Sequence, residues 1–245
     1  MPANPSLPKL IHYCWIGGAP LSDLNHECMA TWQAVMPDHE IILWSEENFP
    51  GELTEDQRLF YENALAARCY SNISNMVRLI ALQKYGGIYL DTDVEVLRPL
   101  DEVWNGEDLV CGWESDAFVN NAILMSKGDN WVLRECLARY GRENEFKRRL
   151  GSRNTRTVVN LDGTEPSNLS GPWLITDVLL LHGGFSVQSE QEQSKRGVTI
   201  LPRQIFYPLP WSQRRNPDAL SEARRSPYAA TIHRWEGTWQ TDEWK

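Results

Sequence analysis

The chain has 245 residues, of which 42% are hydrophobic and 23% charged, the composition of an ordinary soluble globular protein with room for one large domain. Its formal net charge of -9 argues against general nucleic-acid binding, because that activity needs a basic surface. No apolar run approaches the length of a membrane span, and the first nine residues lack the apolar core of a signal peptide. Five scattered cysteines without CxxC spacing indicate buried thiols in a reducing compartment, so we expect a cytoplasmic protein.

The N-terminal part shows the pattern of a strand, a helix and a second strand. Leu10 to Ile16 is an apolar run that Gly17-Gly18 stops. Ser22 is placed to cap a helix that runs towards Met36, and Glu40 to Trp44 has the character of a strand. This order predicts a βαβ unit and an α/β fold with a parallel portion in its sheet.

The strongest helical pattern runs from about Tyr61 to Lys84. It carries one apolar stripe at helical spacing, formed by Ile73, Met76, Val77, Ile80 and Ala81. Asn75 and Arg78 fall on a different face, and polar residues on a helix that is buried on most sides need partners. Gly86-Gly87 is expected to end this helix, because glycine adopts the left-handed cap conformation without strain.

The rest of the chain predicts further short elements within one domain that covers residues 1–245. A short buried strand follows Gly87, and a long polar loop is expected over about residues 151–170. We expect strands at 94–97, 109–113, 122–126 and 198–201, helices at 130–140 and 173–181, and a short apolar run at 229–233 after an arginine-rich polar stretch.

Two carboxylates one residue apart, Asp91 and Asp93, follow the strand after Gly86-Gly87. Alternation along an extended segment would point both side chains the same way, with Thr92 opposite. Such a pair is costly unless a cation lies between its members, and a hard divalent ion, Mg²⁺ or Mn²⁺, suits oxygen ligands. The plainer interpretation is a solvated acidic turn, and the buried strand before the pair favours the metal site.

Other residues could complete such a site, although each also has a structural interpretation. Asn75 and Arg78 lie three positions apart on one helix, so their side chains can converge on phosphate or sugar hydroxyls. Trp15 could stack on a nucleobase at a strand end, or be a core aromatic. His233 follows a short apolar run and could be a third metal ligand, or a structural histidine.

The combination of these segments resembles glycosyltransferase family 32, the glycosyltransferases with a DXD sugar-binding region, which include bacterial polysaccharide enzymes and fungal mannosyltransferases. It is more distantly similar to the glucosylating domains of large clostridial toxins. The matching segments span essentially the whole chain: Leu7 to Gly18, Ser74 to Arg78, Tyr85 to Asp93, and His233 to Trp239.

The resemblance implies a GT-A fold, a Rossmann-like nucleotide-sugar-binding fold with a mixed, mostly parallel sheet flanked by helices. It implies a metal-dependent, retaining transfer of a sugar from a UDP- or GDP-sugar to a glycan or lipid-linked saccharide in cell-surface polysaccharide assembly. The expected catalytic residues are Asp91, Arg78 and Asn75. The donor would contact Trp15, Asn75, Arg78, Tyr89, Asp91 and Trp239, and the Mn²⁺ or Mg²⁺ ion would bind Asp91, Asp93 and His233.

The acceptor side and the cellular location follow less directly. Asn121 and a turn at Gly171-Pro172 lie where such enzymes shape the acceptor site. Clusters of basic residues at 147–149, 214–215 and 224–225 suggest peripheral contact with the inner membrane face, since acceptors in these pathways are often lipid-linked.

Asn75 departs from the family pattern, which usually has Asp at this position. An amide still binds hydroxyl groups, but it supplies no negative charge near a developing oxocarbenium ion. A transferase-like protein that binds a nucleotide or glycan without turnover is therefore one alternative.

A second alternative is a phosphohydrolase of the haloacid-dehalogenase type with Asp91 as its nucleophile. Glu95 stands where that loop usually has Thr or Val, and the motif lies a third of the way along the chain rather than near its start.

Overall fold

The computed structural model describes residues 6–140 and 171–237. Its centre is a seven-stranded sheet with the strand order β2-β1-β3-β6-β5-β8-β7. In that order the strands are Glu40–Trp44, Leu10–Cys14, Gly87–Leu90, Val119–Ser126, Leu109–Trp113, Val198–Leu201 and Gln193–Lys195.

The sheet is mixed and mostly parallel, as expected. β1 pairs in parallel with both β2 and β3, and β5 pairs in parallel with β8, whereas β6 and β7 run in the opposite direction. Because β6 is antiparallel to β3, its beginning lies beside the end of β3, with Leu90 opposite Ile123. This reversal brings residues of β6 to the edge of the sheet where Asp91 follows β3.

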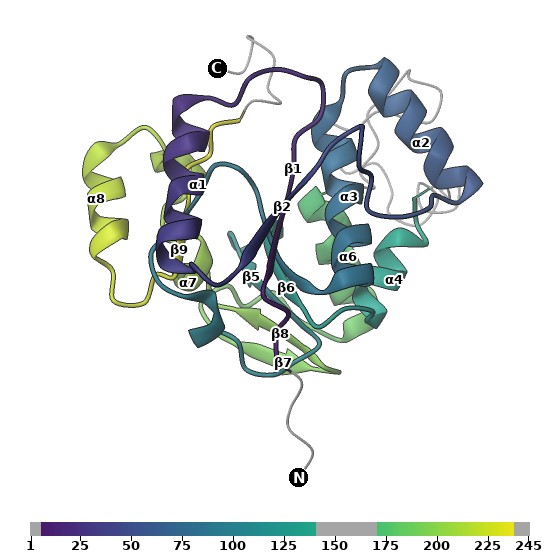
Figure 1. The fold of residues 1–245 in the computed structure, drawn as a ribbon. Helices are drawn as coiled ribbons and strands as arrows, with labels where there is room; N and C mark the ends of the chain where they lie inside the picture. Colours follow the sequence, from purple (N-terminus) through teal and green to yellow (C-terminus); the bar gives the residue numbers. More distant parts are fainter. Residues whose placement is uncertain (1–5, 141–170, 238–245) are drawn as a thin grey trace.

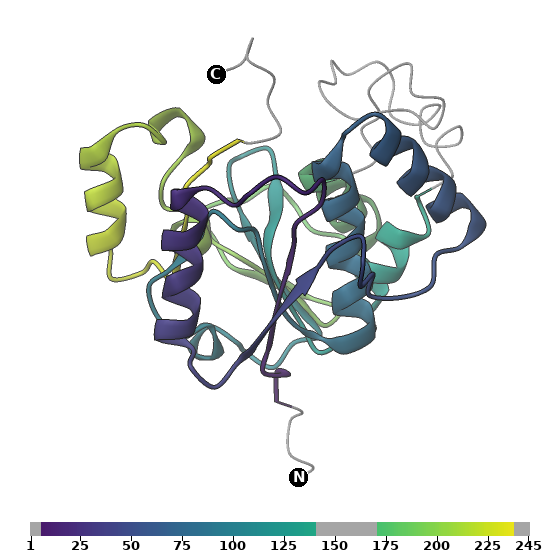
Figure 2. The ribbon, with the colours of Figure 1, turned by 45° about the horizontal axis from the view of Figure 1, so that its top comes forward.

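Helices cover both faces of the sheet (Figure 1). One face packs against α2 (Glu55–Ala66), α3 (Tyr70–Tyr85), α4 (Trp131–Leu137) and α6 (Gly171–Gly183), with a core that includes Ile73, Val132 and Leu179. On the other side lie α1 (Asp23–Val35), α7 (Arg203–Phe206) and, further out, α8 (Pro217–Arg225), with a core that includes Trp32, Phe206 and Ala223. Figure 2 shows the sheet between these two layers.

The predicted βαβ unit is confirmed, and so are the signals that delimit it. Ser22 caps α1, where its side chain accepts a hydrogen bond from the Asn25 backbone and the Asn25 side chain accepts one from Ser22. Gly86 ends α3 with a φ of 65°, and a Cβ at this position would lie 2.6 Å from the carbonyl oxygen of Lys127. Any other residue there would be both strained and obstructed.

The single helix expected from Tyr61 to Lys84 is wrong, because the chain forms two helices there. α2 begins at a Thr54 cap and ends at Ala66, and α3 starts only at Tyr70. Arg68 between them has a φ of 57°, and the Cys69 amide donates to the carbonyl of Ala64 instead of continuing the helix. The apolar stripe lies entirely in α3, which explains why periodicity alone did not locate the break.

A small second sheet lies outside the main one. β4 (Val94–Val96) pairs with β9 (Thr231–His233) in antiparallel fashion, so the strand expected at 94–97 has the apolar run at 229–233 as its partner. Glu95 of β4 forms ion pairs with Arg224 at 2.8 Å and with Arg234 at 3.2 Å. Arg224, expected as part of a basic membrane-facing cluster, therefore fastens α8 to this sheet.

The remaining elements are short or were not expected. α8 lies within the arginine-rich polar stretch, where Asn216 caps it and Pro217 occupies its first turn. Single turns of 3₁₀ helix occur at Leu100–Glu102 and Trp211–Gln213. The loop expected at about 151–170 and the basic residues 147–149 lie outside the described residues.

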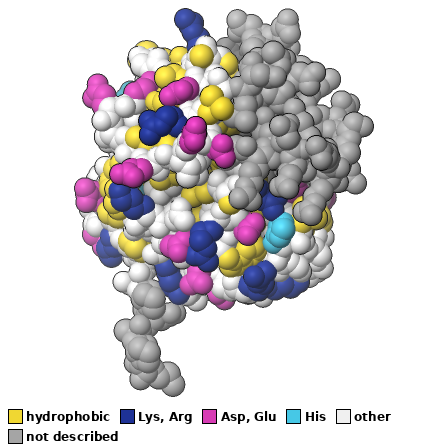
Figure 3. Space-filling view, turned by 90° about the vertical axis from the view of Figure 1, so that its right-hand side faces the viewer, with side chains coloured by type: hydrophobic (Ala, Val, Ile, Leu, Met, Phe, Trp, Pro, Cys, Tyr) yellow, Lys and Arg dark blue, Asp and Glu magenta, His cyan; other side chains and the backbone are white. Residues whose placement is uncertain are grey.

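All five cysteines are free thiols, and all but Cys69 are buried. Within the two described ranges, no helix combines the length and apolar character needed to span a bilayer. Acidic and basic side chains are interspersed over the described part of the face in Figure 3.

Candidate functional site

Asp91, Thr92 and Asp93 form a tight turn between β3 and β4, not the extended segment expected from the sequence. The Asp91 amide donates to Ala122 O at 2.9 Å, and the Val94 amide donates to Asp91 O at 3.0 Å. The chain reverses here because β4 leaves the main sheet to pair with β9. The two carboxylates still face one site, although a turn rather than strand alternation brings them together.

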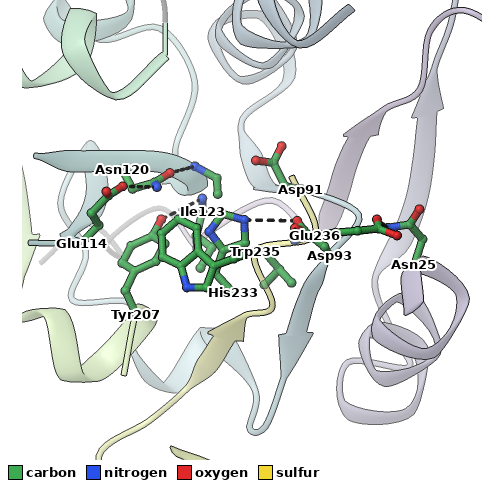
Figure 4. Close-up of polar contacts among 12 residues, drawn as sticks. Asn25, Asp91, Asp93, Glu114, Asn120, Ile123, Tyr207, His233, Trp235 and Glu236 are labelled. Atoms are coloured by element: carbon green, nitrogen blue, oxygen red, sulfur yellow. Dashed lines mark hydrogen bonds and ion pairs between the residues drawn. The ribbon is translucent and has the colours of Figure 1, made fainter. Parts of the chain in front are cut away.

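His233 completes a group of three potential metal ligands with this pair. The pairing of β9 with β4 places His233 opposite Val94, and ligand atoms of Asp91, Asp93 and His233 all lie within 4.8 Å of one another. His233 Nε2 lies 3.2 Å from Asp93 Oδ1, and both side chains are about nine-tenths buried (Figure 4). The structure therefore brings these three residues together, and their binding of a metal ion stays a prediction.

The donor set fits a divalent cation. The two carboxylates suit Mn²⁺ or Mg²⁺, both of which favour oxygen ligands, and the imidazole would add one nitrogen ligand. His233 Nδ1 is buried and has no hydrogen-bond partner among the described residues, so the ring is held without a second polar anchor. It packs instead against the Trp235 ring, with centroids 3.9 Å apart.

The charges in this group depend on one another. Burial raises the pKa of Asp91 more than the Arg78 guanidinium lowers it. Burial also acts to raise the pKa of Asp93, but His233 and the hydrogen bond from the Glu236 amide outweigh it, so that pKa is lowered. The pKa of His233 is raised, because the attraction of Asp93 outweighs burial.

Four hydrogen bonds and one ion pair hold the Arg78 guanidinium in place. It is 3% exposed, and its Nη2 lies 3.0 Å from Asp91 Oδ1. The other bonds reach Asp91 Oδ2 at 3.5 Å, Asn121 O at 2.6 Å, Ser74 O at 3.2 Å and Ser74 Oγ at 2.9 Å. All three nitrogens of the guanidinium are thereby engaged. Direct contact of Arg78 with a sugar stays a prediction and would require one of these bonds to be released.

Tyr89 and Trp15, the two aromatic residues expected at the donor, lie in different surroundings. Tyr89 is 1% exposed beneath Arg78, 4.4 Å from ring centroid to guanidinium carbon, and its hydroxyl is 2.9 Å from Ser74 Oγ. Trp15 is half-buried just after β1, and its Nε1 donates to Ala19 O at 2.6 Å. Because β1 is parallel to β3, Trp15 follows its strand at the same edge as Asp91. Their contacts with a donor remain predictions.

Asn75 lies beside Asn121 and the start of α6. Asn121 Nδ2 donates to Asn75 Oδ1 at 3.0 Å, so the two residues expected at the sugar and acceptor sides do meet. Gly171-Pro172 is not a turn, because these residues begin helix α6. A Cβ at Gly171 would lie 3.1 Å from Asn75 Nδ2, which places this helix end directly against Asn75. Trp239 lies outside the described residues.

Three consecutive residues of β6, Asn120 to Ala122, form hydrogen bonds that connect Glu114, Arg78 and Asp91. The sequence did not indicate these contacts. Asn120 Oδ1 accepts a hydrogen bond from the Ala122 amide at 2.7 Å, and Asn120 Nδ2 donates to Glu114. Asn121 O binds Arg78, and Ala122 O binds the Asp91 amide. In the sequence, two polar residues before an apolar run could have marked these positions. Their role is visible only once β6 is known to run antiparallel to β3, which brings its beginning beside Asp91.

The chain after β9 is also fastened to the carboxylate turn. The Glu236 amide donates to Asp93 Oδ2 at 2.8 Å, and Asn25 Nδ2 donates to Glu236 Oε2 at 2.8 Å. In Figure 2 the last described residues, in yellow, pass beside the beginning of α1, which carries Asn25. Asp93 thus contacts both His233 and the segment that follows it.

Residues 22–110 match the model of the glycosyltransferase sugar-binding region containing the DXD motif. The chain is 32% identical over 170 residues to mouse (Mus musculus) lactosylceramide 4-alpha-galactosyltransferase, covering 66% of this chain and 40% of that protein. It is 27% identical over 131 residues to inositol phosphoceramide mannosyltransferase 3 of Schizosaccharomyces pombe, covering 52% of this chain and 36% of the relative. The chain therefore spans less than half the length of these curated relatives.

The fold also has a solved counterpart. The PaToxG glycosyltransferase superposes with a TM-score of 0.52 at 17% identity, over 73% of this chain and 71% of that one. The mixed sheet with a carboxylate turn at its edge is thus the GT-A fold of glycosyltransferases. Residues 22–110 thus resemble the DXD-containing sugar-binding region of glycosyltransferases, and Asp91-Thr92-Asp93 is the DXD sequence within this range.

Proposed function

We propose that this protein transfers a sugar from a nucleotide-sugar donor to a glycan or glycolipid acceptor, with a divalent metal ion and retention of anomeric configuration. The observation that carries the proposal is the convergence of Asp91, Asp93 and His233 within 4.8 Å, beside an Arg78 that holds Asp91. The two relatives named above bear the names of a galactosyltransferase and a mannosyltransferase that act on ceramide-based lipids, which favours a glycolipid acceptor.

The roles of the residues follow from their contacts. Asp91, Asp93 and His233 hold the cation, which when bound neutralises the diphosphate of the leaving nucleotide. Arg78 keeps Asp91 oriented through its 3.0 Å ion pair, so the ligand set is organised in advance. Asn75 presents its amide to the hydroxyl groups of the donor sugar, and Asn121, which binds Asn75 from the neighbouring strand, lies towards the acceptor side.

A screen of nucleotide release tests this function. The protein is incubated with a panel of UDP- and GDP-sugars, with Mn²⁺, with Mg²⁺ and with chelator, and the released nucleotide is measured. At least one donor should be turned over with metal and not with chelator, and Asp93→Ala should abolish that turnover. NMR of the product should show the same anomeric configuration as the donor sugar. Release that is unaffected by chelator and by Asp93→Ala would refute the proposal.

The two alternatives predict different outcomes in the same experiment. A binding protein without turnover would take up donor in a metal-dependent manner and release no nucleotide, an outcome that the neutral Asn75 makes worth testing. A phosphohydrolase with Asp91 as nucleophile would release phosphate from p-nitrophenyl phosphate and lose that activity in Asp91→Asn. The structure gives this second alternative little support, because both oxygens of Asp91 bind Arg78.

A further inference from the structure

We propose that Glu114, Phe118 and Trp173, here called the acceptor rim, bind the terminal sugar ring of the acceptor, and that this sugar is neutral. The inference rests on the proposed function and adds to it the part of the acceptor that is recognised. None of the three residues stood out in the sequence.

The acceptor rim runs along one side of the candidate site. Glu114 follows β5, and its amide donates to Phe118 O at 2.9 Å across the turn that leads into β6. The Phe118 ring meets the Trp173 ring of α6 edge to face, with centroids 4.4 Å apart. Two residues before Trp173, Gly171 lies against Asn75. The rim therefore extends from Glu114 to the residues proposed to hold the donor sugar.

Glu114 is a carboxylate that is available to bind a ligand. Its carboxyl accepts a hydrogen bond from Asn120 Nδ2, and it has no ion-pair partner among the described residues. Burial raises its pKa, an effect that Asn120 and His233 only partly offset. A half-buried carboxylate without a cation costs stability, and a carboxylate oxygen can accept further hydrogen bonds, such as those from sugar hydroxyls.

The two aromatic rings supply the other half of a sugar site. Phe118 and Trp173 are half-buried, and among the described residues neither belongs to either of the two hydrophobic cores. Apolar and aromatic side chains with a few converging polar groups are the usual lining of a small-molecule site. The C–H face of a hexose can pack on such rings while its hydroxyls reach Glu114. The negative charge of Glu114 disfavours a sugar that carries phosphate or carboxylate.

Saturation-transfer NMR tests the acceptor rim directly. The probes are the methyl glycosides of β-lactose, β-galactose, α-mannose and α-glucose, added to protein saturated with UDP and Mn²⁺, with galactose 6-phosphate as the anionic comparison. At least one neutral glycoside should bind and the anion should not. Glu114→Gln, which preserves shape and removes charge, should weaken binding about tenfold. Trp173→Leu should weaken it as well, whereas Trp131→Leu, which removes a half-buried tryptophan elsewhere, should not.

Nucleotide release in the absence of acceptor, measured on the same variants, separates the two proposals. Saccharide binding that is lost in the rim variants supports the acceptor rim, even where no donor is turned over and the proposed transferase activity fails. The acceptor rim is wrong if no neutral glycoside binds the wild-type protein. It is also wrong if binding persists unchanged in both Glu114→Gln and Trp173→Leu.

Discussion

Arg78 and Asp91 form an ion pair in which both carboxylate oxygens face the guanidinium, at 3.0 and 3.5 Å. Arg78 is almost fully buried, whereas the Asp91 side chain is 29% exposed, so the pair joins the core to the open edge of the sheet. The same guanidinium binds Asn121 O on β6. The orientation of the first carboxylate in the DXD turn is therefore set by helix α3 and strand β6 together.

The first prediction concerns this ion pair. Arg78→Met should lower the free energy of unfolding by about 3 kcal/mol, because it leaves Asp91 without its cation and removes bonds to β6. Arg134→Met is the matched control, since Arg134 forms an exposed pair with Asp129 and should lose less than about 1 kcal/mol. Urea unfolding measures both variants, and equal losses would contradict the role given to Arg78.

The second prediction concerns Gly171, which has a φ of 64° and lies against Asn75. Gly171→Ala should cost about 1 kcal/mol of stability and also reduce turnover, because the added methyl group would press on the Asn75 amide. Gly184→Ala is the matched control, with a φ of 70° and no atom within 4 Å of the new Cβ. It should show the same loss of stability with full turnover. Equal turnover in the two variants would show that Gly171 does not shape the site.

The third prediction concerns the neutral Asn75. Asn75→Asp should raise turnover of the donor and leave the Kd of UDP unchanged, because it adds negative charge beside the proposed sugar site and leaves Asp91, Asp93 and His233 intact. Ser71→Asp adds the same charge one helical turn earlier and should leave turnover unchanged. Steady-state kinetics and UDP titration measure the two quantities. If Asn75→Asp alters UDP affinity and not turnover, the residue belongs to nucleotide binding instead.

The fourth prediction concerns the pH dependence of stability and His12, which is fully buried in β1. Its Nε2 lies 2.8 Å from Gly86 O and must donate, and its Nδ1 accepts from Trp44 Nε1 at 3.2 Å, so the ring is neutral. Burial lowers its pKa below the ordinary 6.5, an effect that the Gly86 hydrogen bond only partly offsets. The unfolded chain then binds this proton more readily, so His12 contributes stability above pH 6.5 that is lost as the pH falls towards the lowered pKa.

A titration by ¹⁵N-edited NMR checks this prediction. The His12 ring should show the Nε2–H tautomer and should titrate below 6.5, and the pH dependence of unfolding should become shallower in His12→Gln. A His12 signal that titrates at or above 6.5 would contradict it.

Local patterns predicted the parts of the fold that local forces determine. Ser22, Gly86 and the apolar runs of β1 and β2 act through neighbours in the sequence, so their positions could be read from composition and spacing. The break at Arg68 could not, because no Gly or Pro lies near it in the sequence and the left-handed φ of 57° falls on an arginine.

The candidate site divides in the same way. Asp91, Asp93 and His233 were found because their residue types carry metal chemistry, whereas their true arrangement depends on β4 leaving the sheet. Asn120, Glu114 and Glu236 were missed because their role arises from long-range contacts: the reversed β6 and the chain after β9. No local pattern in the sequence indicates either arrangement.

The measurement that tests the central claim most directly is the binding of UDP and GDP by isothermal titration calorimetry, with and without Mn²⁺. We predict that one of these nucleotides binds in the presence of Mn²⁺, and that binding is lost with chelator and in Asp93→Asn. Arg134→Met, a change in an exposed ion pair on α4, should bind like the wild-type protein. Nucleotide binding that is equally strong with chelator and in Asp93→Asn would contradict the account of Asp91, Asp93 and His233 as the metal site that holds the donor.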